Sequence, residues 1–210
     1  MEIIAAISGI LLAYLLGSIP TAVWVGKTFY GIDVRTQGSG NAGATNTIRV
    51  LGAKAGVPVL ILDVFKGWLA VFLAGVFIAD GFSESQINII QIIAALAAVL
   101  GHVFPLFAGF RGGKGIATLL GVGIALYPAA VLVVVGIFVL MLVITKYVSL
   151  SSITASISFP FLVIFLFNPG STALIVLSIF VGIFVPITHR KNITRLLKGT
   201  ESKFSLKKKK

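Results

Sequence analysis

The chain has 210 residues, of which 58% are hydrophobic and only 11% are charged, and its mean hydropathy is +1.09. So few charged residues cannot cover the surface of a water-soluble protein of this size, which excludes that class. A membrane barrel would show alternating strands of about ten residues, whereas the apolar stretches here are long and continuous. The composition therefore predicts an all-α polytopic membrane protein, with one integral domain over residues 1–200 and a basic cytoplasmic tail over 201–210.

The formal net charge of +11 would suit a nucleic-acid partner, but the positions of the basic residues indicate membrane topology instead, so no nucleic acid is expected. The chain contains no cysteine, which excludes disulfide bonds, thiolate metal ligands and a cysteine nucleophile. The first apolar run, residues 3–25, is longer than the core of a signal peptide and predicts an uncleaved first helix.

The apolar stretches predict seven transmembrane helices, at about 20 apolar residues for each crossing. Gly17 and Pro20 predict a kink near the end of the first. Asp63 and Lys66, at i and i+3 in the second, can neutralise each other, and a structural pair is favoured over a proton relay. The fourth is only about 20 Å long and is expected to lie in the protein interior. The predicted ranges are 3–25, 55–79, 87–107, 115–127, 128–146, a sixth that follows a turn at 147–152 and ends near 167, and 172–187.

Every lysine and arginine except Lys66 follows an odd-numbered predicted helix. By the positive-inside rule, the N-terminus is then outside and the C-terminus cytoplasmic. The polar stretches 38–49, 109–115, 149–152 and 189–195 share the cytoplasmic face in this arrangement. The terminal lysines are expected to contact anionic membrane lipids.

Residues 38–49 are rich in glycine and small polar side chains, which is unusual in so apolar a chain. Glycines let backbone N–H groups approach a ligand, hydroxyl and amide side chains add donors, and Arg49 adds a forked cation. This combination predicts a loop that binds phosphate, and an ordinary connecting loop is the alternative. The candidate binding residues are Gly38, Ser39, Gly40, Asn41, Gly43, Thr45, Asn46 and Arg49.

A second glycine-rich stretch, Gly112, Gly113, Lys114 and Gly115, stands directly before an expected helix. A helix N-terminus favours negative charge, so this stretch is a second candidate anion site, and a basic turn at the membrane surface is the alternative. Two such loops on one face predict a site for two phosphate-bearing groups.

Two nucleotide-binding patterns match only in letters. The glycines at 38, 40 and 43 fit G-x-G-x-x-G, but they follow a membrane helix where that motif requires a β-strand. Gly113-Lys114 resembles a P-loop, but Gly115 stands where the magnesium-binding Ser or Thr belongs. Both nucleotide interpretations are rejected.

The two histidines favour different interpretations. His102 is expected to pack between helices and to bond a neighbouring carbonyl. His189 and Asn192, three residues apart at the membrane edge, are expected to project from one helical face, and a direct functional role for His189 stands beside a packing role.

Three motifs in order resemble the PlsY family of bacterial membrane acyltransferases, and the resemblance covers essentially the whole chain. They are Gly-Ser-Gly-Asn-Ala-Gly-Ala-Thr-Asn-Thr-Ile-Arg at 38–49, Gly-His-Val-Phe-Pro-Leu-Phe-Ala-Gly-Phe-Arg-Gly-Gly-Lys-Gly-Ile-Ala-Thr at 101–118, and His-Arg-Lys-Asn-Ile-Thr-Arg-Leu at 189–196. The resemblance implies transfer of an acyl group from acyl phosphate to glycerol 3-phosphate, giving lysophosphatidic acid and phosphate in phospholipid synthesis. It also implies a multi-pass protein of the bacterial plasma (inner) membrane, with an active site that faces the cytoplasm.

The resemblance implies that six residues are catalytic, namely Ser39, Arg49, Lys114, Ser149, His189 and Asn192. It gives Glu201 a structural role and requires no cofactor and no metal. The general base is left open between a substrate phosphate oxygen, which is favoured, and His189. An organic-phosphate transporter is the alternative function, although carriers usually show inverted repeats and midplane polar sites. Acyl-chain preference, kinetic order and oligomeric state are not indicated.

Overall fold

The computed structural model describes residues 2–77 and 81–205, all of which are helical or in turns and loops. Asp80, the end of the second predicted span and the terminal lysines lie outside the described residues. Contacts within the chain form two compact units, Met1–Ala125 with Ser205–Lys210, and Leu126–Phe204.

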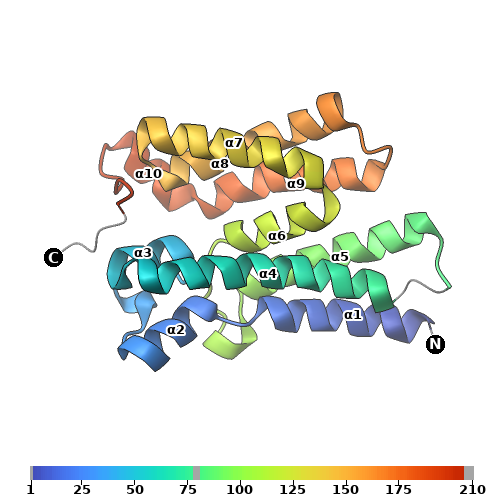
Figure 1. The fold of residues 1–210 in the computed structure, drawn as a ribbon, viewed down its shortest axis with the longest axis horizontal. Coiled ribbons are helices and arrows are strands. Elements are labelled where there is room, and N and C mark those ends of the chain that lie inside the picture. The colour runs from blue at the N-terminus through green and yellow to red at the C-terminus, as the bar shows by residue number, and fades with distance from the viewer. Residues whose placement is uncertain (1, 78–80, 206–210) are drawn as a thin grey trace. The chain divides into compact units, whose positions relative to one another are not determined.

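The first unit is built on three long helices, α1 (Glu2–Gly17), α4 (Ala53–Phe77) and α5 (Glu84–Val103), which pack against one another (Figure 1). Small residues allow this close packing, as is usual between membrane helices. A side chain at Gly17 would overlap the Ala98 carbonyl, and one at Gly101 would overlap the Tyr14 carbonyl. The buried core of the three helices consists of Ala13, Ala70, Ala74, Ala94 and Ala98.

Shorter elements of the first unit carry the candidate loops. After α1 come α2 (Thr21–Tyr30), the 3-10 turn η1 (Val34–Thr36) and α3 (Ala44–Leu51), and after α5 come a second 3-10 turn, η2 (Leu106–Ala108), and α6 (Ile116–Leu126). α6 is held against α4 by two glycines, because side chains at Gly67 and Gly121 would overlap backbone atoms of Thr118 and Val64. The glycine loop before α6 therefore ends at a helix whose position is fixed against α4.

The second unit consists of α7 (Pro128–Thr145), α8 (Val148–Phe161), the π-helical turn η3 (Leu162–Phe167), α9 (Thr172–Thr188) and α10 (Arg190–Leu197). α8 packs against both α7 and α9. The Tyr127 hydroxyl donates a hydrogen bond of 2.6 Å to the Leu174 carbonyl, and the Tyr127 ring meets Phe159 edge-on at 5.0 Å between ring centroids. These contacts fix the start of α7 to the start of α9.

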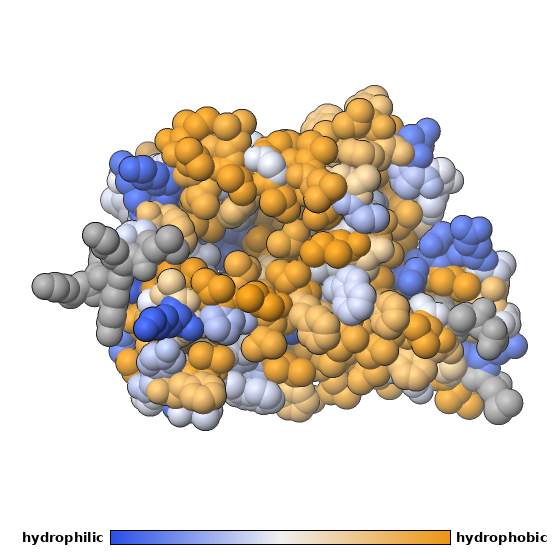
Figure 2. All heavy atoms as spheres, in the orientation of Figure 1, coloured by the Kyte–Doolittle hydropathy of each residue, from blue (hydrophilic) through white to orange (hydrophobic). Residues whose placement is uncertain are grey.

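Hydropathy supports a membrane location for both units. Within the described residues, four segments are each long and apolar enough to cross a bilayer, namely 53–77, 84–108, 128–145 and 148–167. If each of the bent pairs, α1 with α2 and α9 with α10, is counted as one span, the number of spans is six. The outer face of α7 exposes Leu132, Leu140 and Val143 at 59–75%, and Figure 2 shows this region as hydrophobic. The all-helical membrane class is thus confirmed, whereas seven crossings stay a prediction.

Two boundaries predicted from the sequence were right and two were wrong. The kink at Gly17 to Pro20 is a 41° bend between α1 and α2, and α7 begins at Pro128. The stretch 38–49 is only half a loop, because α3 begins at Ala44. The predicted turn at 147–152 is mostly helix, since α8 begins at Val148. Short polar residues such as Ser fit a helix in a membrane by bonding a carbonyl one turn earlier, as Ser151 does with Tyr147.

Candidate active site

Asn46 shapes the first candidate loop from its buried position on α3, where it is 1% exposed. Its Oδ1 accepts a hydrogen bond of 2.8 Å from the Ser39 backbone N–H, and its Nδ2 donates to the carbonyls of Val34 at 2.8 Å and Gln37 at 3.1 Å. The loop turns through Gly38 and Gly40, whose φ angles of 61° and 71° favour glycine. Asn46 therefore organises the loop, and the exposed Ser39 lies at its tip.

Arg49 lies on α3, one turn beyond Thr45 and half-buried. Among the residues that the structure describes, its guanidinium has no hydrogen bond or ion pair, and neither do the hydroxyls of Ser39 and Thr45. A half-buried arginine without a protein partner is well suited to bind an anion, because its planar fork can hold two oxygens at once.

The second candidate loop is bonded directly to the end of α5. The N–H groups of Gly112 and Gly113 donate to the carbonyls of Val103 and His102, each at 3.1 Å. Gly112 cannot be replaced without displacing backbone, because a Cβ there would overlap the His102 carbonyl. The half-buried Lys114 follows, and α6 begins immediately after Gly115.

The structure brings these two loops together. A Cβ placed on Gly113 would lie 3.1 Å from the carbonyl oxygen of Ala42. Arg35, which precedes the first loop, also binds the segment that precedes the second, since its Nη1 donates to the Ala108 carbonyl at 2.7 Å. Its Nε and Nη2 donate to the carboxylate of Asp33 at 3.0 and 2.8 Å. The hydrogen bond from Arg35 holds the pKa of Asp33 well below its usual range. The motifs did not reveal Arg35, because nothing in the sequence links it to Ala108.

A helix N-terminus lies at each of the two loops. α3 follows Gly43, which has no side chain to cap the first N–H groups, and α6 follows Gly115. Uncapped N–H groups and the helix dipole attract negative charge. With Arg49 on α3 and Lys114 just before α6, the first unit therefore holds two kinds of group that can bind phosphate, helix N-termini and cations.

In the second unit, three side chains donate hydrogen bonds to the carboxylate of Glu201. Its Oε1 accepts hydrogen bonds from Ser149 at 2.8 Å and Asn192 at 2.6 Å, and its Oε2 accepts one from Arg195 Nε at 2.6 Å. Burial alone would raise the pKa of Glu201, but these hydrogen bonds outweigh it and lower the pKa below the ordinary 4.5. The predicted residues Ser149 and Asn192 are thus brought together, and Arg195 joins them without having been predicted.

A pH dependence of stability follows from the lowered pKa of Glu201. The carboxylate stabilises the fold above its ordinary pKa, and this contribution is lost as the pH falls through the lowered value. We expect the melting temperature of the wild-type protein to fall between about pH 6 and pH 3 by more than that of Glu201→Gln. Equal slopes for the two proteins in detergent melting curves would contradict the linkage.

His189 lies at the break between α9 and α10, where it is 3% exposed. Its Nδ1 is 2.8 Å from the Val185 carbonyl, which can only accept, so this nitrogen carries the proton. In the neutral ring Nε2 is then the acceptor, which is the form that a general base requires. His189 stands at the 59° bend between α9 and α10 as the residue before α10, and the Asn192 N–H donates to its carbonyl at 2.8 Å, so the two residues lie one turn apart.

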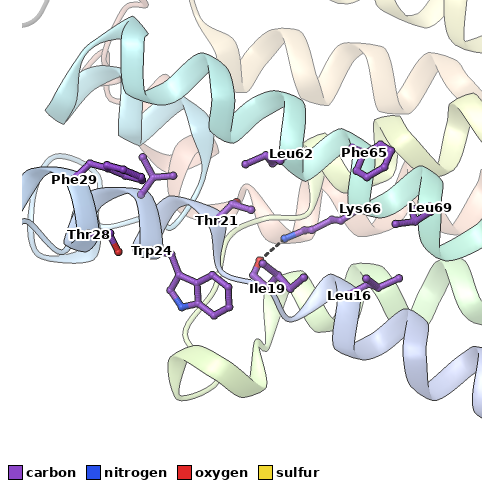
Figure 3. Close-up of a pocket in the computed structure, with 11 residues that line it drawn as sticks. Leu16, Ile19, Thr21, Trp24, Thr28, Phe29, Leu62, Phe65, Lys66 and Leu69 are labelled. Carbon is purple, nitrogen blue, oxygen red and sulfur yellow. Dashed lines mark hydrogen bonds between the residues drawn. The ribbon is translucent and has the colours of Figure 1, made fainter.

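A buried polar network lies beside the loops of the first unit. Asp63 Oδ1 accepts from the Thr21 hydroxyl at 2.6 Å and pairs with Lys66 at 2.8 Å, which confirms the predicted pair. His102 Nδ1 lies 3.6 Å from the same oxygen, so the prediction that His102 bonds a carbonyl was wrong. Lys66 also donates to the Ile19 carbonyl at 2.8 Å (Figure 3). The break between α1 and α2 exposes that carbonyl to Lys66, which the sequence pattern could not show.

Lys66 also lines an apolar cavity of about 480 Å³. Its lining comes from α1, α2, α4 and the break between the first two helices, and Trp24, Phe29 and Phe65 supply aromatic rings (Figure 3). None of the candidate residues in 38–49 or 112–115 is among its lining residues. The cavity is therefore separate from the two candidate loops.

Comparison with known proteins gives one consistent answer. A sequence profile described as "Glycerol-3-phosphate acyltransferase" matches residues 7–199. Proteins named glycerol-3-phosphate acyltransferase are 46% identical in Fusobacterium nucleatum, over 93% of this chain and 96% of that protein, and 48% identical in Trichlorobacter lovleyi, over 91% and 94%.

Solved structures agree with the sequence relatives. Crystal structures of PlsY (YgiH), an integral membrane glycerol 3-phosphate acyltransferase, match in the glycerol 3-phosphate form with a TM-score of 0.83, over 95% of this chain and 96% of that one. The lysophosphatidic acid form matches with a TM-score of 0.80 over 96% of each chain, and both are 40% identical in sequence. The chain therefore belongs to the glycerol-3-phosphate acyltransferase family of integral membrane proteins.

Proposed function

We propose that this protein transfers an acyl group from acyl phosphate to glycerol 3-phosphate, giving lysophosphatidic acid and inorganic phosphate. Family membership supports the acceptor and the product, because the related crystal structures carry glycerol 3-phosphate and lysophosphatidic acid. The observation that carries the proposal here is the pairing of two glycine-rich loops in the first unit that also holds Arg49, which has no partner among the described residues. Both substrates bear phosphate, which is what such loops bind.

The reaction needs positioning and charge stabilisation more than strong nucleophilic chemistry. The glycerol hydroxyl oxygen attacks the acyl carbonyl carbon, the bond from that carbon to the phosphate oxygen breaks, and phosphate leaves with its electron pair. The hydroxyl proton passes to a phosphate oxygen or to His189 Nε2. Acyl phosphate is a mixed anhydride whose phosphate leaves readily, so holding the two substrates in line supplies much of the rate.

Each candidate residue has a proposed role. Arg49 and Lys114 neutralise phosphate charge, and Ser39 and Thr45 donate hydrogen bonds to a phosphate group. Asn46 holds the loop in place through its three backbone contacts, so its role in substrate binding is indirect. The remaining proposed catalytic residues are Ser149, His189 and Asn192, and the remaining proposed binding residues are Gly38, Gly40, Asn41, Gly43, Gly112, Gly113 and Gly115.

We further propose seven crossings of the bacterial plasma membrane, with the N-terminus outside and the site at the cytoplasmic face. Single cysteines can be introduced into this cysteine-free chain at Ser85 and Ser202, which are both exposed. In intact cells, an impermeant maleimide is expected to label Ser85→Cys but not Ser202→Cys, because the basic residues place the tail inside. Labelling of Ser202→Cys alone would reverse the orientation.

Direct transfer between bound substrates is the simplest route in a chain without cysteine, which cannot form a thioester intermediate. We expect no labelled acyl group on the protein after incubation with labelled acyl phosphate in the absence of glycerol 3-phosphate. Thiol reagents should leave the activity unchanged. A stable acyl-protein adduct at Ser39 would contradict direct transfer.

The transporter alternative predicts a different result from the enzyme in a detergent assay. A carrier moves glycerol 3-phosphate between compartments and makes no lipid, whereas the enzyme makes lysophosphatidic acid in detergent micelles, where no compartments exist. We expect purified protein in detergent to form labelled lysophosphatidic acid with acyl phosphate as the donor and none with an acyl thioester. Lipid formation from the thioester alone would contradict the proposed donor, and no lipid product from either would contradict the proposed function.

A further inference from the structure

The buried network around Asp63 brings three ionisable side chains together inside the helices of the first unit, Asp63, Lys66 and His102. Asp63 is 1% exposed, and Thr21, Lys66 and His102 are at most 7% exposed. Ionisable groups inside membrane helices are costly and are usually retained for a function. The proposed reaction does not use this network directly, so a role for it must come from its contacts with the two loops.

His102 connects the network to the second loop. Its Nδ1 faces Asp63, while the opposite edge of the same ring, at Nε2, packs so closely on Gly113 that an added Cβ would overlap it. The backbone of His102 also accepts the hydrogen bond from Gly113 N–H at 3.1 Å. The ring and the backbone of one residue thus hold the same glycine.

The first loop meets Gly113 on the same side as the His102 ring, because both border the position of an added Cβ. The Ala42 carbonyl, which belongs to the first loop, lies 3.1 Å from the position of a Cβ on Gly113. The separation of the two loops at this point therefore depends on how far the His102 ring projects. That projection depends on Asp63, whose Oδ1 is fixed by Thr21 at 2.6 Å and Lys66 at 2.8 Å.

We propose that Asp63 and His102 are a positioning pair, which sets the second glycine loop at the distance from the first loop that glycerol 3-phosphate binding requires. This inference rests on the proposed function, because it assigns the acceptor phosphate to the loop that carries Lys114. Neither residue contacts the substrate, and both act through Gly113.

Two substitutions at His102 separate the two edges of the ring. His102→Phe keeps a ring against Gly113 but loses the interaction with Asp63, whereas His102→Asn keeps a donor at the position of Nδ1 but loses the ring edge that contacts Gly113. We expect the dissociation constant for glycerol 3-phosphate to rise about tenfold in both variants, because each removes one of the two contacts through which the pair acts and small displacements of positioning groups weaken binding strongly. The KM for acyl phosphate should stay unchanged in both variants.

Binding of labelled glycerol 3-phosphate to detergent-purified protein, matched for folded fraction, is the primary measurement. Ser18→Ala is the matched control, since it removes a buried hydroxyl without a described partner from the same unit and should leave binding unchanged. Gly113→Ala pushes on the same ring from the loop side and should weaken binding in the same way, which provides a second reading if His102→Phe does not fold.

Unchanged affinity in the His102 variants, with only a lower melting temperature, would overturn the positioning role and leave a purely structural one. An equal loss for both substrates would also overturn it. Because the binding constant is measured without turnover, failure of acyl transfer in the wild-type protein would count against the proposed function alone. Selective loss of glycerol 3-phosphate affinity in both His102 variants, with the KM for acyl phosphate unchanged, is the result that supports the pair.

Discussion

Replacing Arg49 by glutamine is expected to lower kcat/KM for acyl transfer by about 30- to 1000-fold, which corresponds to about 2 to 4 kcal/mol of transition-state binding. Arg49 has no partner among the described residues, so its side chain has no structural bond to lose. Arg49→Lys keeps the charge but cannot hold two oxygens in a rigid fork, and it should also lose most of the activity. Steady-state kinetics on purified variants, matched for folded fraction, test both changes.

Lys54→Gln is the matched control for Arg49. Lys54 is exposed near the start of α4, close in sequence to Arg49, and its replacement by glutamine removes the same single positive charge. It should leave kcat/KM nearly unchanged. If Arg49→Gln behaved like Lys54→Gln in kinetics and differed only in membrane insertion or thermal stability, Arg49 would be an anchor at the membrane surface.

Replacing Lys114 by glutamine is expected to raise the KM for glycerol 3-phosphate, with a loss in kcat/KM of about 2 to 4 kcal/mol. Lys114 follows the two glycines that are bonded to the end of α5, so its backbone position is fixed. An ammonium acts as a point charge, and Lys114→Arg should therefore retain part of the activity, unlike Arg49→Lys. A rise in the KM for acyl phosphate instead would place Lys114 at the donor.

The sequence predicted the helical membrane class and the approximate limits of the long helices because hydropathy and proline act locally. The bend after Gly17 and the start of α7 at Pro128 are examples. The start of α3 at Ala44 was missed, since small polar residues are equally common in loops and at helix N-termini. The start of α8 at Val148 was missed for the same reason.

The candidate site was predictable in composition but not in internal contacts. The first motif identified Asn46 and the family resemblance identified Ser149, yet neither showed that Asn46 supports the loop backbone or that Ser149 donates to Glu201, 52 residues later. Arg35 and His102 act through contacts with residues far along the chain, to Ala108 and Asp63. Such contacts depend on helix packing, and a single sequence contains no periodic signal for them.

The stoichiometry of the reaction tests the central claim most directly. Purified protein is incubated in detergent with acyl phosphate and labelled glycerol 3-phosphate, and lysophosphatidic acid and inorganic phosphate are measured over time. We predict that the two products form in equal amounts, only when both substrates are present, and that Arg49→Gln slows both alike. Phosphate released without lysophosphatidic acid, or lysophosphatidic acid formed without phosphate, would contradict acyl transfer from acyl phosphate to glycerol 3-phosphate.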